Sequence, residues 1–214
     1  WQTLPVNPTT PRRWHSPYEA LSAFAGNPLF ISPDLLVRDG LLSKETVDGL
    51  PALAHGQVDY EHAGERKQHL LASAYEQFCQ AGHNAAFDDF CEQEADWLDD
   101  YALFAALRRH HPDNLWWEWV EELRDRHHER IQQFAHENQA DVECEKFIQY
   151  CFFRQWFALK SYANRRGIQL VGDVPFYVGA DCADVWQHPH LFKLHDDKRL
   201  RAVAGVPPDR FSET

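Results

Sequence analysis

Residues 172–189 read GDVPFYVGADCADVWQHP and follow a short apolar run that contains Ile168, Leu170 and Val171. This pattern predicts a strand that delivers the carboxylate of Asp173 at its C-terminal end, where parallel β-barrel enzymes carry their functional residues. An ordinary turn is the alternative, because an aspartate close to a proline is common in turns. The stretch therefore favours a barrel strand that leads into a functional site, and leaves the turn open.

Two large aromatic side chains, Tyr177 and Trp186, follow in the same stretch among Gly, Asp and His residues. Aromatic rings on a polar loop suit the binding of a flat, polar ligand such as a sugar. The loop is thus a candidate carbohydrate contact.

Length and composition limit the fold and the class of partner. The 214 residues are 44% hydrophobic and 14% aromatic, enough to bury a sizeable core. A complete eight-stranded barrel needs about 250 residues, so we expect only part of one, with about two barrel strands. The net charge of −12 argues against a nucleic-acid surface, which needs clustered Lys and Arg. A neutral partner is more natural. The sequence contains no apolar run of about 18 residues, so it predicts no membrane-spanning helix.

The cysteines indicate a reducing compartment, because their number is odd and none has C-x-x-C spacing. They are Cys79, Cys91, Cys144, Cys151 and Cys182. We therefore expect a cytoplasmic protein.

Neighbouring histidines, His110 with His111 and His127 with His128, raise the question of a metal. Adjacent residues on a helix point about 100° apart and do not converge on one ion, and no HExxH motif is present. We expect neither a metal nor another cofactor.

Helices are predicted over most of the chain between two short strands. Ser16 with Pro17 and Ser32 with Pro33 are typical of helix N-termini, and glycines follow the expected ends. Apolar residues at spacings of three and four support the longer helices. We expect a strand over 1–5, a strand over 168–171, and helices over 16–26, 33–38, 43–49, 64–81, 84–92, 95–109, 116–124 and 125–166, the last with a break near Asn138.

Several long segments resemble one enzyme family. They are GDVPFYV and DVWQHP within 172–189, VAGVPPDRFSET at 203–214, WQTLPVNPT at 1–9 and SPYEALSAFAGNPLFIS at 16–32. These resemble the amylomaltases, the disproportionating 4-alpha-glucanotransferases of glycoside hydrolase family 77. The resemblance spans nearly the whole chain and is strongest at its two ends.

The resemblance implies an α/β fold: a partial TIM (β/α)8 barrel with a large all-helical subdomain inserted between two barrel strands. On this basis we expect residues 1–19 to form a barrel strand and its loop, and 20–145 to form the insertion. Residues 146–214 would then supply a barrel helix, a strand and an active-site loop. A free-standing helical bundle with one strand is the alternative.

The reaction implied by the resemblance is a retaining double displacement on an α-1,4-glucan. An Asp attacks the anomeric carbon, a Glu protonates the leaving oxygen, and an acceptor sugar takes the glucosyl unit. The family's nucleophile and acid/base motifs have no counterpart here, and we expect them beyond Thr214. The chain alone is therefore predicted to be inactive, as an internal fragment whose partners are α-1,4-glucans and maltooligosaccharides.

Matches to the family predict substrate contacts at Ser16, Tyr18, Asp173, Trp186, Pro208, Asp209 and Phe211. Asp173 would support the donor sugar or orient an arginine beside the nucleophile, and a mobile loop carrying Phe211 would cover the glucan. Structural roles remain open as alternatives. Ser16 could cap a helix, Tyr18 could lie in the core, and Trp186 could be a buried anchor as readily as a sugar contact.

The chain departs from the family pattern in two places. TPRRWH at 10–15 stands where many members have a Gly-Tyr-Gly-Asp-like turn, so Trp14 could replace an outer glucan-binding tyrosine, and Arg210 stands where an aromatic is frequent. Two other functions stay open: a non-catalytic glucan-binding piece and, less favoured, an α-amylase-type hydrolase. Such hydrolases usually carry a strand motif that ends in Asn-His, which the VPFYV segment of this chain does not match.

Overall fold

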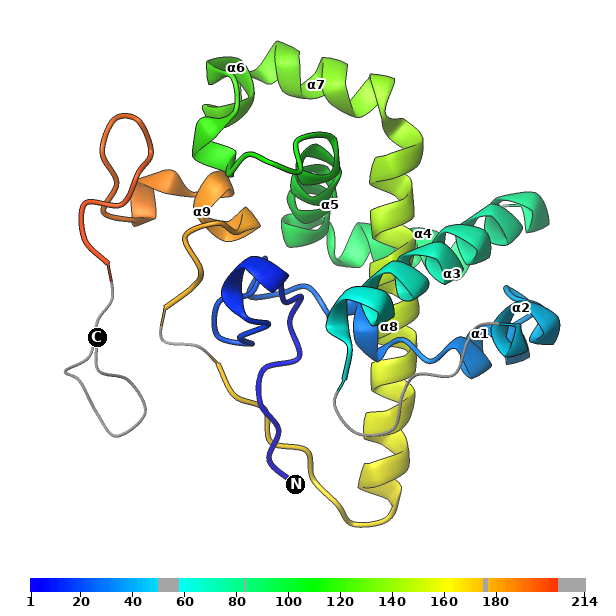
Figure 1. Ribbon diagram of the computed structural model, residues 1–214. Helices are drawn as coiled ribbons and strands as arrows, with labels where there is room; N and C mark the ends of the chain where they lie inside the picture. The colour runs from blue at the N-terminus through cyan, green and yellow to red at the C-terminus, as the bar shows by residue number, and fades with distance from the viewer. Residues whose placement is uncertain (50–57, 83, 175–176, 204–214) are drawn as a thin grey trace.

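The computed structural model describes residues 1–49, 58–82, 84–174 and 177–203. These residues form a mainly helical assembly around one long helix (Figure 1). The α-helices are α1 (Pro33–Arg38), α2 (Lys44–Asp48), α3 (Tyr60–Ala81), α4 (Ala85–Gln93), α5 (Ala95–His110), α6 (Glu121–Arg124), α7 (His128–Glu137), α8 (Gln139–Arg165) and α9 (Ala183–Gln187). Short 3-10 turns cover Pro11–Arg13, Pro28–Phe30, Trp116–Glu118 and Pro189–Leu191.

Helix α8 is the spine of the molecule. Its 27 residues span about 40 Å at 1.5 Å per residue, and it packs against α5, α3 and α4 (Figure 1). The first half of α8 buries Phe147, Ile148 and Phe152, whereas Phe157 and Leu159 in its second half are more than half exposed. The helix therefore joins the helical core at one end and extends toward the chain's N-terminus at the other.

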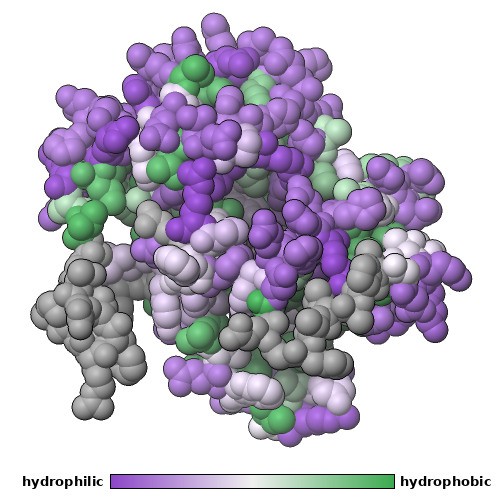
Figure 2. All heavy atoms as spheres, viewed as in Figure 1, coloured by the Kyte–Doolittle hydropathy of each residue, from purple (hydrophilic) through white to green (hydrophobic). Residues whose placement is uncertain are grey.

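Two groups of apolar side chains flank this spine. One group gathers between α5 and α9 and includes Phe104, Trp116, Trp119 and Trp186. The other gathers where α1 and α3 meet α8 and includes Leu71. In Figure 2 the surface over α6 and α7 is mainly hydrophilic, which suits a core buried beneath amphipathic helices. None of the described helices combines the length and the apolar character that crossing a bilayer requires.

Side-chain caps start several helices where the sequence predicts them. Ser32 Oγ accepts from Leu35 N at 3.4 Å, Ser43 Oγ from Thr46 N at 3.0 Å, and Asn84 Oδ1 from Ala86 N at 3.0 Å. Each cap satisfies an amide that has no partner within its own helix. The helices expected over 33–38, 43–49, 84–92 and 95–109 are confirmed within one or two residues, and so is the break at Asn138 between α7 and α8.

The helix expected over 16–26 is absent, which corrects one prediction. Backbone amides of this segment bond to distant groups instead of to carbonyls four residues earlier. Leu21 N donates to Pro8 O at 2.9 Å, and Gly26 N donates to Gln149 Oε1 at 2.7 Å. Because these tertiary bonds take the amide hydrogens, the Ser-Pro signal at residue 16 begins a looped segment and Ser16 caps no helix.

Other boundaries also differ from the prediction. Helix α3 begins at Tyr60, and the single helix expected over 116–124 is a 3-10 turn followed by α6. Trp119, 5% exposed, adopts an extended conformation between them. The extended backbone that buries this side chain interrupts the helix. Helix α9 forms in a stretch for which the sequence predicts a loop.

The two expected strands meet but remain short. Gln2 and Val171 form a parallel bridge, in which Thr3 N donates to Val171 O at 2.9 Å and Val171 N donates to Trp1 O at 2.8 Å. In Figure 1 the N-terminal segment lies beside the chain that returns from α8. The described residues contain this parallel contact and no longer strand, so the barrel itself is not seen in them. Helix α8 runs through residue 145 without a break, and the division into subdomains stays a prediction.

We predict that Gln149→Leu lowers the free energy of unfolding by about 2 to 3 kcal/mol. Gln149 is 0% exposed and bonds both backbone groups of Gly26, accepting from its N–H at 2.7 Å and donating Nε2–H to its carbonyl at 3.1 Å. Leucine would leave both groups buried and unpaired. Denaturant unfolding of the protein that carries the chain measures the loss. The exposed Gln80→Leu is the matched control, and an equal loss in both variants would contradict the prediction.

Candidate functional site

Tyr18 and Asp173, both predicted from the sequence, lie together. The Tyr18 hydroxyl donates a hydrogen bond to Asp173 Oδ2 at 2.9 Å. The parallel contact between Gln2 and Val171 places the two following segments at the same end of the paired backbone, which brings these side chains within reach. Tyr18 is 42% exposed, so the pair lies at the surface and is open to a ligand.

The carboxylate also changes the acidity of its partner. The hydrogen bond from Tyr18 to Asp173 raises the pKa of the Tyr18 hydroxyl above its usual value, with smaller contributions from desolvation and from the negative charge of Asp173. The hydroxyl is therefore a proton donor that fixes one oxygen of the carboxylate. A bond from a hydroxyl to an ionised acceptor is stronger than a neutral one.

Ser16 lies in the turn that leads to Tyr18. Its carbonyl accepts from Glu19 N at 3.3 Å, and its side chain is partly buried. Two residues earlier, Trp14 is 95% exposed and has a left-handed backbone with φ of 52°. The neighbouring His15 ring stacks on Tyr60 at 4.4 Å between ring centroids. Residues 10–15, where the chain departs from the family pattern, are called the divergent loop below. This loop exposes the Trp14 ring to solvent and holds the adjacent His15 ring against Tyr60.

Trp186 is buried, which favours the anchor over the sugar contact, the two roles that the sequence leaves equally open. It has 0% exposed surface, and its Nε1–H donates to Leu123 O at 3.0 Å. Its ring contacts Phe104 and Trp119, and the guanidinium of Arg126 lies 4.1 Å from its centroid. A side chain enclosed in this way has no face left for a ligand, so Trp186 holds α9 in place.

The loop before α9 is held by residues that the sequence did not single out. Trp116 Nε1–H donates to Ala180 O at 2.9 Å, and Arg108 forms an ion pair with Asp181. Tyr177, at the start of this loop, is 72% exposed. Arg108 lies in the last turn of α5, where basic residues are favoured, so no local signal in the sequence points to its pairing with Asp181.

The remaining predicted contacts, Pro208, Asp209 and Phe211, lie outside the described residues. Their roles stay predictions.

A cavity of 570 Å³ lies beside the divergent loop and is lined by His15, Pro17, Tyr60 and Lys67, among others. Lys67 donates to Ile31 O, and burial lowers the pKa of its ammonium to about 8. The cavity walls are mainly apolar. It does not include Tyr18 or Asp173, so size alone does not identify the site.

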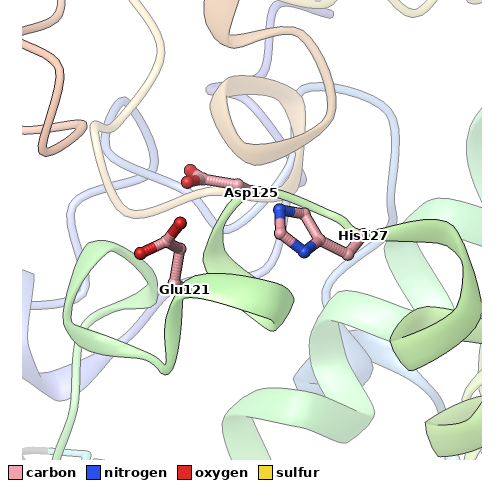
Figure 3. Close-up of side chains that lie close together, drawn as sticks. All are labelled: Glu121, Asp125 and His127. Atoms are coloured by element: carbon pink, nitrogen blue, oxygen red, sulfur yellow. The ribbon is translucent and has the colours of Figure 1, made fainter.

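Among the described residues, one group of side chains has the spacing of metal ligands. Atoms of Glu121, Asp125 and His127 lie within 4.8 Å of one another (Figure 3). Asp125 already bonds Arg124 Nη2 at 2.7 Å and lies 3.5 Å from Lys198 Nζ. Because two cations already balance this carboxylate, the group gives no independent sign of a metal.

Comparison with known proteins decides the family. The family described as 4-alpha-glucanotransferase, glycoside hydrolase family 77, matches residues 1–214. The chain belongs to this family. Among its relatives, the 4-alpha-glucanotransferase of Aquifex aeolicus is 39% identical over 214 residues, and that of Thermus thermophilus is 41% identical over 217 residues. Both alignments cover 100% of the chain, but only 43% and 42% of the relatives, so the chain spans less than half of their length.

Solved structures agree with this assignment. The amylomaltase of Streptococcus agalactiae in complex with acarbose has a TM-score of 0.88 and 38% identity, covering 100% of this chain and 43% of that one. The amylomaltase of Corynebacterium glutamicum, at 18% identity and a TM-score of 0.65, shares the fold over 99% of this chain and 29% of its own. The resemblance expected from the quoted motifs is confirmed.

We predict that Asp173→Asn lowers the pKa of Tyr18 toward the usual value of about 10. The substitution removes the negative charge and weakens the hydrogen bond that raises this pKa. NMR titration of the protein with Cζ-labelled tyrosine measures the shift. Asp48→Asn, at the end of α2, is the control, and a Tyr18 pKa that stays unchanged in Asp173→Asn would contradict the pairing.

We predict that Trp186→Phe lowers the free energy of unfolding by about 2 kcal/mol. The smaller ring leaves a cavity, loses the bond to Leu123 and weakens the contact with Arg126. The matched control is Trp14→Phe, at an exposed tryptophan, and it should change the free energy of unfolding by about 0.5 kcal/mol or less. If the two variants unfold at the same denaturant concentration, Trp186 is not the anchor.

Proposed function

We propose that the protein containing this chain transfers α-1,4-glucan segments between maltodextrins by a retaining double displacement. Membership of the 4-alpha-glucanotransferase family supports the reaction. The hydrogen bond between Tyr18 and Asp173 is the observation that ties this chain to it, because it orders two residues that match the family's motifs near the substrate.

In such a reaction two carboxyl groups about 5 Å apart act as nucleophile and as acid/base. We assign neither group to this chain, and propose that both belong to parts of the protein outside it. The chain would position the glucan. It would also form part of a TIM barrel, with residues 20–145 as a helical insertion between two of its strands.

Asp173 would act as an acceptor for sugar hydroxyl groups. Tyr18 holds one carboxylate oxygen by its 2.9 Å bond, which fixes the orientation of the second oxygen for a substrate. A carboxylate already oriented by a neighbour loses less freedom when a sugar binds. The amylomaltase of Streptococcus agalactiae is in complex with acarbose, which supports a sugar-like ligand for the protein that contains this chain.

Three further elements belong to this proposal. The exposed Trp14 would offer a platform for a glucan outside the active site, in place of the tyrosine frequent in the family. The loop with Pro208, Asp209 and Phe211 would cover the glucan and exclude water, which favours transfer over hydrolysis. A cytoplasmic location agrees with five cysteines that form no disulfide. A non-catalytic glucan-binding role is the second candidate, and family membership does not favour it.

Chromatography of products formed from maltotriose tests the function. The full-length protein should produce glucose and longer dextrins, whereas the 214-residue chain alone should produce neither. In the full-length protein, Tyr18→Phe should lower kcat/KM about tenfold and Asp173→Ala about a hundredfold or more, since the first loosens the carboxylate and the second removes it.

Tyr162→Phe, at an exposed tyrosine on α8, is the control and should leave kcat/KM unchanged. Transfer by the short chain alone would overturn the placement of the catalytic carboxylates. Full activity in Asp173→Ala would overturn the role given to the pair.

A further inference from the structure

Two hydrogen bonds join helix α9 to the loop that carries Tyr18. Ala183 N donates to Leu21 O at 2.8 Å, and Ala23 N donates to Asp184 Oδ2 at 3.0 Å. The acceptor of the second bond is a carboxylate, and charged acceptors form stronger hydrogen bonds than neutral ones. Asp184 thus links α9 to the loop through its side chain.

Helix α9 is a rigid base for this contact. Three of its five residues are buried, and Trp186 Nε1–H donates to Leu123 O at 3.0 Å. Burial raises the pKa of the neighbouring Cys182 thiol, and the charge and the hydrogen bond of Asp184 raise it further, so the thiol stays protonated and can donate to the carboxylate. The Asp184 carboxylate therefore has a fixed location.

The loop depends on contacts with other segments, because residues 16–26 contain no helix. Leu21 N donates to Pro8 O at 2.9 Å, a residue outside the loop. Tyr18 is 42% exposed, so packing against the core does not by itself hold its ring. The place of its hydroxyl, 2.9 Å from Asp173 Oδ2, therefore follows from the bonds that hold the loop.

An acidic residue in the first turn of a helix has an ordinary explanation, since it interacts favourably with the helix dipole. Asp34 in the first turn of α1 is such a residue and is exposed. Asp184 differs because its carboxylate accepts the amide hydrogen of a residue 161 positions away in the chain. Its contact with Ala23 therefore joins two distant segments, which the dipole does not explain.

We propose that Asp184 is a positioning residue for the glucan-transfer site, which holds the loop so that the Tyr18 hydroxyl donates to Asp173. The proposal rests on the proposed function and adds a residue of α9 to it. Asp184 acts through Ala23 and the loop and does not touch the substrate. Loss of its carboxylate frees the loop and loosens the bond between Tyr18 and Asp173.

Two measurements on the full-length protein test this role. In Asp184→Ala the pKa of Tyr18 should fall toward the usual value of about 10. The kcat/KM for maltotriose should fall about fivefold, the effect of one lost hydrogen bond at a partly exposed position. Asp184→Asn keeps an oxygen that accepts from Ala23 N, so both values should stay close to those of the unchanged enzyme. Asp34→Ala, at the same place in α1, is the matched control and should change neither value.

A double-substitution cycle separates positioning from a general loss of stability. Tyr18→Phe has no hydroxyl left to position, so adding Asp184→Ala should lower kcat/KM by less than about twofold more. An equal effect of Asp184→Ala with and without the Tyr18 hydroxyl overturns the positioning role. So does a Tyr18 pKa that Asp184→Ala leaves unchanged.

Thermal unfolding shows whether each variant folds. If Asp184→Ala does not fold, Asp184→Ser decides, because serine suits the start of a helix but is too short to replace the acceptor of Ala23 N. Absence of transfer by the unchanged enzyme overturns the proposed function, whereas the pKa of Tyr18 supports or overturns the role of Asp184 without any transfer.

Discussion

Two backbone hydrogen bonds between the start of the chain and the segment after α8 determine where the candidate site forms. They join Thr3 and Trp1 to Val171 in a parallel arrangement. In a parallel pair both segments leave the contact in the same direction. Tyr18 and Asp173 therefore lie at one end, and the bond from Ala183 N to Leu21 O, 2.8 Å long, joins the same two segments further along.

Hydrogen bonds to buried backbone groups then set the path of the loop that carries Tyr18. Gln149 enters from α8 and bonds both backbone groups of Gly26, while Leu21 N bonds Pro8 O. Buried amides need partners, and here the partners are distant in sequence. A ring of Phe152 also occupies the space that a side chain at residue 26 would need, which explains the glycine.

Buried aromatics support the opposite side of the site. Trp116 and Trp186 are fully buried, and each donates its indole N–H to a backbone carbonyl in a neighbouring segment. Arg126 covers the Trp186 ring. These contacts fix the loop between Tyr177 and α9, so Gly179 is held against the backbone of Glu19 and Ala20 with a packed core behind it.

The sequence alone determined most helices, the break at Asn138 and the family, and it singled out Tyr18 and Asp173, which the structure brings together. Each depends on local signals: a capping side chain, a periodic apolar face or a motif contiguous along the chain. The tertiary structure alone decided that 16–26 is not a helix and that Trp186 is buried. It also decided that Arg108 pairs with Asp181, because amide partners, burial and ion pairs depend on residues far apart in the chain, which no local pattern records.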